Sequence, residues 1–124
     1  MNSYSPFKGK TGFKRVCNAT QYSLAGFKAA FNHEAAFRQV LLLNTILIPS
    51  SFFLELTAVE HALIVAVCLL ALIVELFNSA IEAVVDRISL EKHPLSKNAK
   101  DMGSAAQFVA LGMIFFVWLI ILLK

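Results

Sequence analysis

Three long apolar runs constrain this chain more than any other feature of its sequence. They read LLLNTILIPSSFF, ALIVAVCLLALIV and FVALGMIFFVWLIILL, and they dominate a chain of 124 residues that is 58% hydrophobic. Soluble domains average ~45–50% apolar residues, and a domain this short has too little interior to bury the excess. Lipid is therefore the expected solvent for these runs.

We predict an all-α membrane protein, because a helix satisfies its own backbone hydrogen bonds within the hydrocarbon. The whole chain, 1–124, forms one integral-membrane domain in this prediction. Helices of about 20 residues cross the bilayer, so each apolar run supplies one crossing. The predicted layout is an amino-terminal segment at 1–39, spans at 40–56, 58–85 and 105–123, and a loop at 86–104.

The basic residues predict the orientation of the spans. Two groups of Lys and Arg flank the apolar runs, whereas the short turn around Thr57 has none. Loops rich in Lys and Arg stay in the cytoplasm, so the amino-terminal segment and the second loop are expected there. These residues are Lys8, Lys10, Lys14, Arg15, Lys28 and Arg38 before the first span, and Arg87, Lys92, Lys97 and Lys100 before the third.

The segment from Tyr22 to Arg38 has the periodicity of an amphipathic helix. Its apolar arc is formed by Leu24, Phe27, Phe31 and Ala35. An apolar face opposite a basic and polar face is typical of a helix that lies in the membrane interface. We therefore expect an interfacial helix ahead of the first span.

A polar stripe runs along the carboxyl half of the second span, in VELFNSAIEAVVDRI at 74–88. At 100° per residue, one sector of this helix holds Glu75, Ser79, Glu82 and Asp86, with Asn78 beside them. An acid at the bilayer centre costs roughly 2.5–3.5 kcal/mol on insertion scales, so an acid there indicates function. For Ser79, a hydrogen bond between helices is explanation enough.

The depths of the two glutamates suggest separate roles. In the predicted orientation Glu82 lies near the cytoplasmic surface, where it and Glu34 could bind a hard divalent cation through oxygen. Glu75 lies about 10 Å deeper, which suits a general base acting on a group held in the bilayer. Because three spans cannot shield the stripe from lipid on every side, we expect a homo-oligomer.

The second loop reads SLEKHPLSKNAKDMGS and collects further polar residues at the membrane surface. Lys100 and Asp101 come just before the third span, where the start of a helix could hold phosphate on its unbonded amides. For His93 and Lys97, a solvated loop that sets orientation is at least as good an explanation as a functional role.

Four segments resemble the prokaryotic integral-membrane diacylglycerol kinases, in order and at the expected spacing. They are GFKR at 12–15, NHEAAFRQ at 32–39, VELFNSAIEAVVDRI at 74–88 and AKDMGSAA at 99–106. The resemblance implies a homotrimer of the bacterial inner membrane. It also implies Mg²⁺-dependent transfer of the γ-phosphate of ATP to the hydroxyl of diacylglycerol, which gives phosphatidic acid.

The same resemblance implies a role for each matching residue. Glu75 matches the catalytic base, Glu34 and Glu82 match the magnesium ligands, and Asn78 matches a polar residue beside the base. Lys92 stands where the family has an aromatic residue. The implied nucleotide contacts are Arg15, Tyr22, Glu34, Glu82, Glu91, Lys92, His93, Lys100 and Asp101, and the implied lipid contacts are Arg15, Phe37, Arg38, Glu75, Ser104 and Trp118.

Two other functions compete with this interpretation. An undecaprenol kinase would share the ELxN and AIEAVVD patterns, and HPL at 93–95 resembles that branch, but KDMGSAA favours the diacylglycerol branch. A small proton-coupled transporter subunit could use Glu75 and Glu82 as relay groups. Against a transporter, only the second span carries buried ionisable residues. Nucleic-acid binding is not expected, because the sequence has no basic patch with interleaved aromatic residues.

Overall fold

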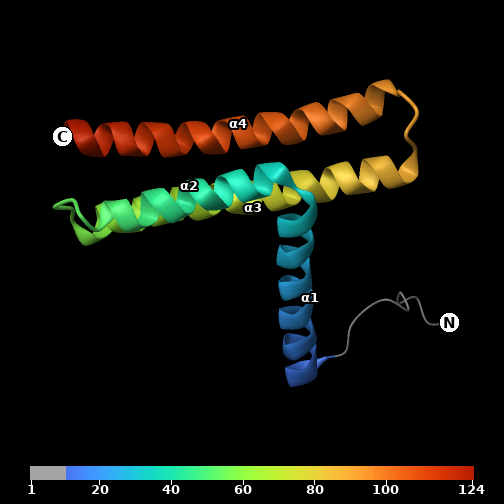
Figure 1. Cartoon of the computed structure of the whole chain (residues 1–124), viewed down its shortest axis with the longest axis horizontal. Helices are drawn as coiled ribbons and strands as arrows, with labels where there is room; N and C mark the ends of the chain where they lie inside the picture. Colours follow the sequence, from blue (N-terminus) through green and yellow to red (C-terminus); the bar gives the residue numbers. More distant parts are fainter. Residues whose placement is uncertain (1–10) are drawn as a thin grey trace.

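The computed structural model describes residues 11–124, and this part of the chain forms four α-helices. They are α1 (Gly12–His33), α2 (Ala35–Ser51), α3 (Ala58–Ile88) and α4 (Pro94–Leu123). The last three run side by side, and α1 projects sideways from the start of α2 (Figure 1). The all-α prediction is confirmed. Lys8 and Lys10, which entered the orientation argument, lie outside the described residues.

Both α3 and α4 are long and apolar enough to cross a membrane. They have 31 and 30 residues, or about 45 Å each, so their ends extend beyond ~30 Å of hydrocarbon. Much of the segment at 86–104, predicted as a cytoplasmic loop between two spans, is helical, since only residues 89–93 separate the two helices; its place in the cytoplasm stays a prediction. Pro94 starts α4 at a position that suits proline, and the His93 side chain accepts a hydrogen bond from Leu95 N at 3.1 Å. Loss of apolarity therefore marks the end of the span, not the end of the helix.

The helix of the first predicted span ends at Ser51, five residues before the predicted boundary at 56. Pro49 has no N–H to donate within α2, and the last residues turn more tightly. Phe52 N bonds to Pro49 O at 3.1 Å, and the Ser50 hydroxyl bonds back to Ile46 O at 2.5 Å. With 17 residues α2 is about 25 Å long, so its crossing of the membrane stays a prediction.

The predicted helix from Tyr22 to Arg38 is two helices separated by Glu34. This residue has extended backbone, with φ −119° and ψ 105°, and it caps both α1 and α2. The guanidinium of Arg38 donates to Phe31 O at 2.6 Å and so satisfies a carbonyl near the end of α1. The break allows α1 to leave the bundle.

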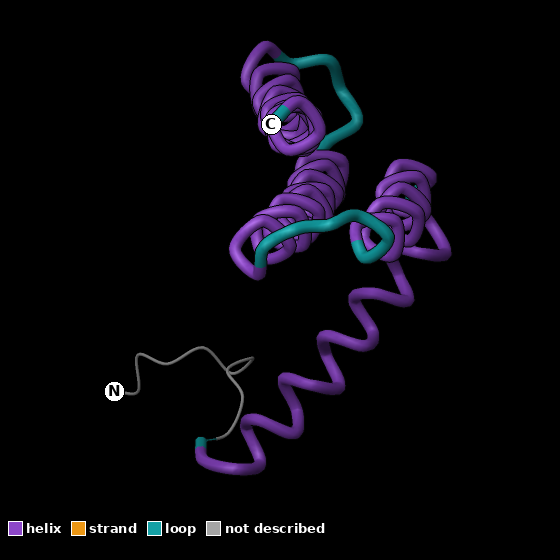
Figure 2. The backbone as a smooth tube through the Cα atoms, turned by 90° about the vertical axis from the view of Figure 1, so that its left-hand side faces the viewer, coloured by secondary structure: helices purple, strands orange, loops and turns teal. Residues whose placement is uncertain are grey.

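Helix α3 contacts both α2 and α4, and the three helices are seen end-on in Figure 2. Two buried amides bond to its backbone: Asn44 Nδ2 donates to Cys68 O at 2.8 Å, and Gln107 Nε2 donates to Ala71 O at 3.2 Å.

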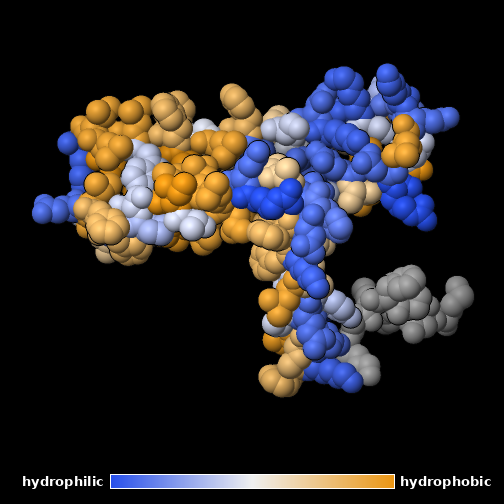
Figure 3. Space-filling model, in the orientation of Figure 1, coloured by the Kyte–Doolittle hydropathy of each residue, from blue (hydrophilic) through white to orange (hydrophobic). Residues whose placement is uncertain are grey.

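Many large apolar side chains face outward along the bundle, as lipid contact requires, and polar residues gather at the end near residues 89–93 (Figure 3). The apolar core consists of Val40, Ile64, Val67, Cys68, Ala71, Ala110, Ile114 and Ile121.

Candidate active site

The predicted polar stripe is one continuous face of α3. Glu75, Asn78 and Ser79 are buried on it, with Glu75 only 3% exposed, and Glu82 is half-buried one turn further along. Asn78 Nδ2 donates to Glu82 Oε1 at 3.4 Å. The stripe therefore faces protein rather than lipid at the depth of Glu75.

Two other segments of the chain approach Glu75. Gln107, from α4, donates to Ala71 O one turn before Glu75, so its amide lies beside the Glu75 side chain, and the amides of Gln107 and Asn78 both act on the carboxyl. The charges of Glu82 and of Glu34, at the break before α2, also act on this carboxyl. Both predicted metal ligands are therefore near enough to Glu75 for their charges to act on its carboxyl.

The donor set of this group fits Mg²⁺. Glu34 and Glu82 offer carboxylate oxygens, whereas Asn78 Oδ1, buried without a hydrogen-bond partner among residues 11–124, lies against Gly103 of α4. Magnesium is commonly held by one or two carboxylates together with substrate phosphates. The described chain has no cluster of three or more His, Cys, Asp or Glu suited to a metal. Phosphate oxygens of a bound nucleotide would therefore have to complete the coordination.

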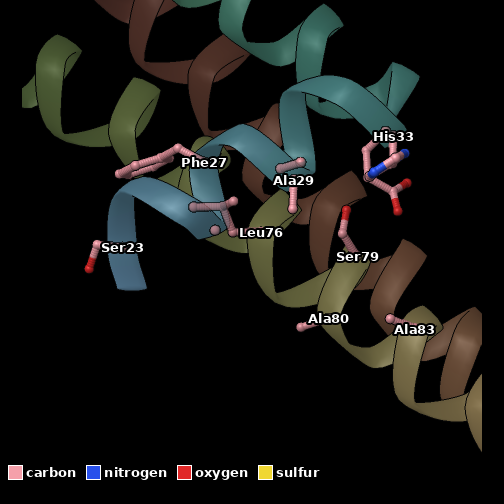
Figure 4. Close-up of a pocket in the computed structure, with 11 residues that line it drawn as sticks. Ser23, Phe27, Ala29, His33, Leu76, Ser79, Ala80 and Ala83 are labelled. Carbon is pink, nitrogen blue, oxygen red and sulfur yellow. The ribbon is translucent and has the colours of Figure 1, made fainter. Parts of the chain in front are cut away.

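A cavity of about 560 Å³ lies between α1 and α3 beside this group. Its walls are mostly apolar, including Phe27 and Leu76, and Glu34 is at its edge. Ser79 points into the space from α3 (Figure 4). The predicted hydrogen bond from Ser79 to another helix is wrong: within the described residues its buried hydroxyl has no partner. Ser79 borders the cavity and makes no bond to α1, whose residues Ala30 and His33 line the same space.

A second cavity, of about 900 Å³, lies where α3 and α4 are joined. Lys100 crosses from α4 to α3 here, with its Nζ 2.6 Å from Asp86 Oδ1. The Asp86 carboxylate raises the pKa of Lys100 and so favours its charged form. Five of the predicted nucleotide residues line this cavity, namely Glu91, Lys92, His93, Lys100 and Asp101.

The predicted use of a helix start at Lys100 and Asp101 is wrong. Helix α4 already begins at Pro94, so the two residues are its seventh and eighth, where backbone amides bond within the helix. Phosphate recognition in this cavity would depend on side chains. The lysine ammonium and the imidazole Nε2 of His93, whose Nδ1 accepts from Leu95 N, can supply donors.

The remaining predicted contacts do not gather around Glu75 within one chain. Arg15 and Tyr22 are exposed on α1, which leads away from the bundle (Figure 1). Trp118 lines an apolar groove of about 400 Å³ between α2 and α4. Of the other implied lipid contacts, Phe37 is buried, Ser104 is exposed and Arg38 bonds to the backbone of α1.

The sequence prediction missed two residues of this site, Gly103 and Gln107. A Cβ on Gly103 would collide with Asn78 Oδ1, so the glycine allows α4 to pass close to the stripe. Gln107 lies one turn later on the same face of α4. A lone amide at the edge of an apolar span is costly in lipid, and this signal could have identified Gln107 from the sequence.

Comparison with known proteins places this geometry in a family. The family model described as prokaryotic diacylglycerol kinase matches residues 21–122. The chain belongs to this family. It is 71% identical over 121 residues to the diacylglycerol kinase of Pseudomonas aeruginosa, with 98% of each chain covered. The Haemophilus influenzae kinase is 50% identical (87% of this chain, 92% of the relative), and the Escherichia coli kinase is 45% identical (90% and 92%).

Membership of the prokaryotic diacylglycerol kinase family confirms the resemblance and the prediction of a membrane-embedded kinase. The matched segment contains Glu34, Glu75 and Glu82 and the residues of the second cavity. Arg15 lies before the matched segment. Its predicted role in binding nucleotide and lipid stays a prediction.

Proposed function

We propose that this protein transfers the γ-phosphate of ATP to the free hydroxyl of diacylglycerol and releases phosphatidic acid and ADP, with Mg²⁺ as cofactor. The observation that carries the proposal is the buried carboxyl of Glu75 on α3, a helix long enough to span a membrane, with Glu82 on the same helix and Glu34 at the break before α2 near enough to act on it. A water-soluble acceptor would not require a base at this depth. The names of the relatives support diacylglycerol as the acceptor.

In the proposed reaction the lipid hydroxyl oxygen bonds to the γ-phosphorus while the bond from that phosphorus to the β–γ bridging oxygen breaks. Glu75 takes the hydroxyl proton, and ADP leaves with the bridging oxygen. Phosphoryl transfer depends mainly on positioning and on stabilising negative charge at phosphate oxygens. The apolar cavity beside Glu34 can take the glyceride end of the lipid, and Lys100 can neutralise phosphate charge from the second cavity.

Glu34 and Glu82 would hold the magnesium ion together with the nucleotide phosphates. When bound, the ion supplies positive charge at those phosphates. Asn78 orients Glu82 through its amide, which donates to Oε1 at 3.4 Å. Asn78 also lies against Glu75, so it links the base to the proposed metal ligand.

We further propose a homotrimer in the bacterial inner membrane, with the amino terminus and residues 89–93 in the cytoplasm. Apolar side chains cover the outer surface of the bundle, and Arg15, Tyr22 and Trp118 lie away from Glu75 within one chain. Assembly would let neighbouring chains cover part of the polar stripe. Scattering-based mass measurement of the protein in micelles tests the trimer, and a monomeric mass would contradict it.

The activity is tested with purified protein in detergent micelles, ATP labelled at the γ-phosphate, and either diacylglycerol or undecaprenol as acceptor. We expect phosphatidic acid to form in the presence of Mg²⁺ and little transfer to undecaprenol. Faster turnover of undecaprenol would replace the proposed acceptor. Proton flux in liposomes without ATP would instead support a transporter.

Glu75→Gln tests the base. We expect the assembly to remain intact and turnover to fall by at least about 10²-fold, because a neutral amide cannot accept the hydroxyl proton. Glu55→Gln is the matched control, since Glu55 is an exposed acid in the turn between α2 and α3. Substantial activity in the Glu75 variant would exclude it as the base.

Glu82→Gln tests the metal site through a magnesium titration. Loss of one carboxylate ligand should move the half-saturating Mg²⁺ concentration upward by roughly tenfold, as loss of about 1.4 kcal/mol of binding would. An unchanged titration would argue against Glu82 as a ligand.

A further inference from the structure

Gln107 is a buried polar residue that the proposed reaction does not use. Its side chain is 8% exposed and lies in an otherwise apolar stretch of α4. Nε2 donates to Ala71 O at 3.2 Å, and Ala71 lies one helical turn before Glu75 on the same face of α3. Within the described residues the buried Oε1 has no hydrogen-bond partner.

The side-chain amide of Gln107 is next to the side chain of Glu75. The bond to Ala71 O places the Gln107 amide beside the Glu75 side chain on the same face of α3, where the amides of Gln107 and Asn78 act on the carboxyl. An amide offers both a donor and an acceptor, so it can bond to a carboxyl that carries a proton and to one that does not. Gln107 Nε2 has a second N–H beside the one donated to Ala71 O, and its Oε1 has no partner among the described residues, so Gln107 can bond to the Glu75 carboxyl from α4.

We propose that Gln107 is a positioning residue for catalysis: it ties α4 to the α3 backbone at Ala71 and holds the carboxyl of Glu75 in the orientation that receives the proton of the lipid hydroxyl. This inference rests on the proposed function of Glu75 as the base. It assigns Gln107 no contact with ATP or lipid. Its removal should therefore slow the chemical step and leave substrate binding unchanged.

Gln107→Met tests this role, because methionine keeps the length and volume of the side chain but cannot hydrogen bond to a carboxyl. We expect kcat to fall by roughly tenfold or more, as misplacement of a reacting group does, while KM for ATP and for diacylglycerol stay within about twofold. A fall in kcat of less than threefold, or a change mainly in KM, would overturn the proposal.

Asn44→Leu is a matched control for structural effects. Asn44 is also a buried amide, 5% exposed, that bonds a neighbouring helix to an α3 carbonyl, and its Oδ1 also has no partner among the described residues. The carbonyl that it contacts, that of Cys68, lies about two turns from Glu75. Loss of this bond should lower thermal stability in micelles as much as Gln107→Met does, with kcat within about twofold of the wild type. An equal loss of kcat in both variants would reduce Gln107 to a structural role.

An infrared measurement separates this inference from the proposed activity. The carboxyl stretching band of Glu75 is the band that Glu75→Gln removes, and its frequency depends on the hydrogen bonds of the carboxyl. Gln107→Met should shift that band, and Asn44→Leu should not. A band that does not move would overturn the inference even if the wild type is an active kinase. If Gln107→Met shifts the band but the wild type does not phosphorylate diacylglycerol, only the proposed function is overturned. If Gln107→Met does not fold, Gln107→Asn makes the same tests, because its amide is one methylene too short to reach Glu75.

Discussion

At the scale of single residues, Glu75 is accommodated in a membrane-spanning helix because polar side chains from two helices surround it. Asn78 on its own helix and Gln107 on α4 lie against the carboxyl. Gly103 has no side chain to keep α4 away from Asn78. Buried polar groups that contact one another in this way behave as a unit, so a change to one is felt by the others.

Gly103→Ala should disturb this unit by steric collision. The new Cβ would clash with Asn78 Oδ1, and forcing a methyl group into a packed interface typically costs about 1–3 kcal/mol. The measurement is the free energy of unfolding in micelles, by titration with sodium dodecyl sulfate. Gly112→Ala is the control, because a Cβ there meets nothing within 4 Å and alanine favours a helix over glycine. Equal stability of the two variants would show that α4 does not approach Asn78 as the structure has it.

Lys100→Met should weaken nucleotide binding. Lys100 lines the second cavity, and a hydrogen bond to a charged group contributes about 1.5–3 kcal/mol, so we expect KM for ATP to rise by about tenfold or more. Lys97→Met is the control, because Lys97 lines the same cavity with a side chain that is 76% exposed and paired with Asp101 at 2.5 Å. A similar KM for ATP in both variants would remove Lys100 from the nucleotide site.

At the scale of elements, α3 organises the molecule. It carries the polar stripe, contacts both neighbouring helices and runs beyond the hydrocarbon toward the second cavity. A capping box closes its other end: Thr57 N donates to Glu60 Oε1 at 3.1 Å, and Glu60 N donates to Thr57 Oγ1 at 3.2 Å. The cap fixes where α3 starts after the turn from α2, and so fixes the position of the stripe along the bundle.

Thr57→Ala should lower the free energy of unfolding by about 0.5–2 kcal/mol, because it removes the acceptor for one of the unbonded amides in the first turn of α3. The same detergent titration measures this loss. Thr45→Ala serves as the control, since the Thr45 hydroxyl donates only to Leu41 O inside α2, at 2.8 Å, and such a bond adds little to helix stability. If Thr45→Ala is the more damaging change, the capping box does not anchor α3.

At the scale of the whole molecule, apolar and polar surfaces are separated along the bundle. Polar residues gather around 89–93, and apolar ones cover the opposite part (Figure 3). Helix α1 leaves the bundle sideways with Phe13, Phe27 and Phe31 exposed. This arrangement supports an interfacial position for α1 on the same side of the membrane as residues 89–93, which remains a prediction.

The two cysteines provide a direct test of that orientation. Cys17 is exposed on α1 and Cys68 is buried in α3. A maleimide that cannot cross membranes should label the protein in inverted inner-membrane vesicles and leave it unlabelled in right-side-out spheroplasts. Cys17→Ser should abolish the labelling, which assigns it to α1. Labelling of Cys17 from outside would reverse the predicted topology.

The sequence by itself determined the helical class, the membrane as solvent and the face of α3 on which Glu75 and Glu82 lie. These are local properties: apolarity over about 20 residues and a 100° step per residue are set by residues close together in the chain. The same local patterns did not predict the end of α2 at Ser51 or the start of α4 at Pro94. A helix can continue where apolarity stops, as α4 does, and can end within an apolar run, as α2 does after Pro49. They also missed the break at Glu34, where no glycine or proline marks it.

Only the tertiary structure decided which residues meet. Gln107 is 32 positions after Glu75, and their contact depends on how α3 and α4 are aligned along their lengths and rotated about their axes. Side-chain shape sets that alignment, as with Gly103 opposite Asn78, and periodicity within one helix carries no information about it. Glu75 could therefore be singled out from the sequence as a candidate base, and Gln107 could be noticed there as a costly amide, but only the structure places Gln107 beside Glu75.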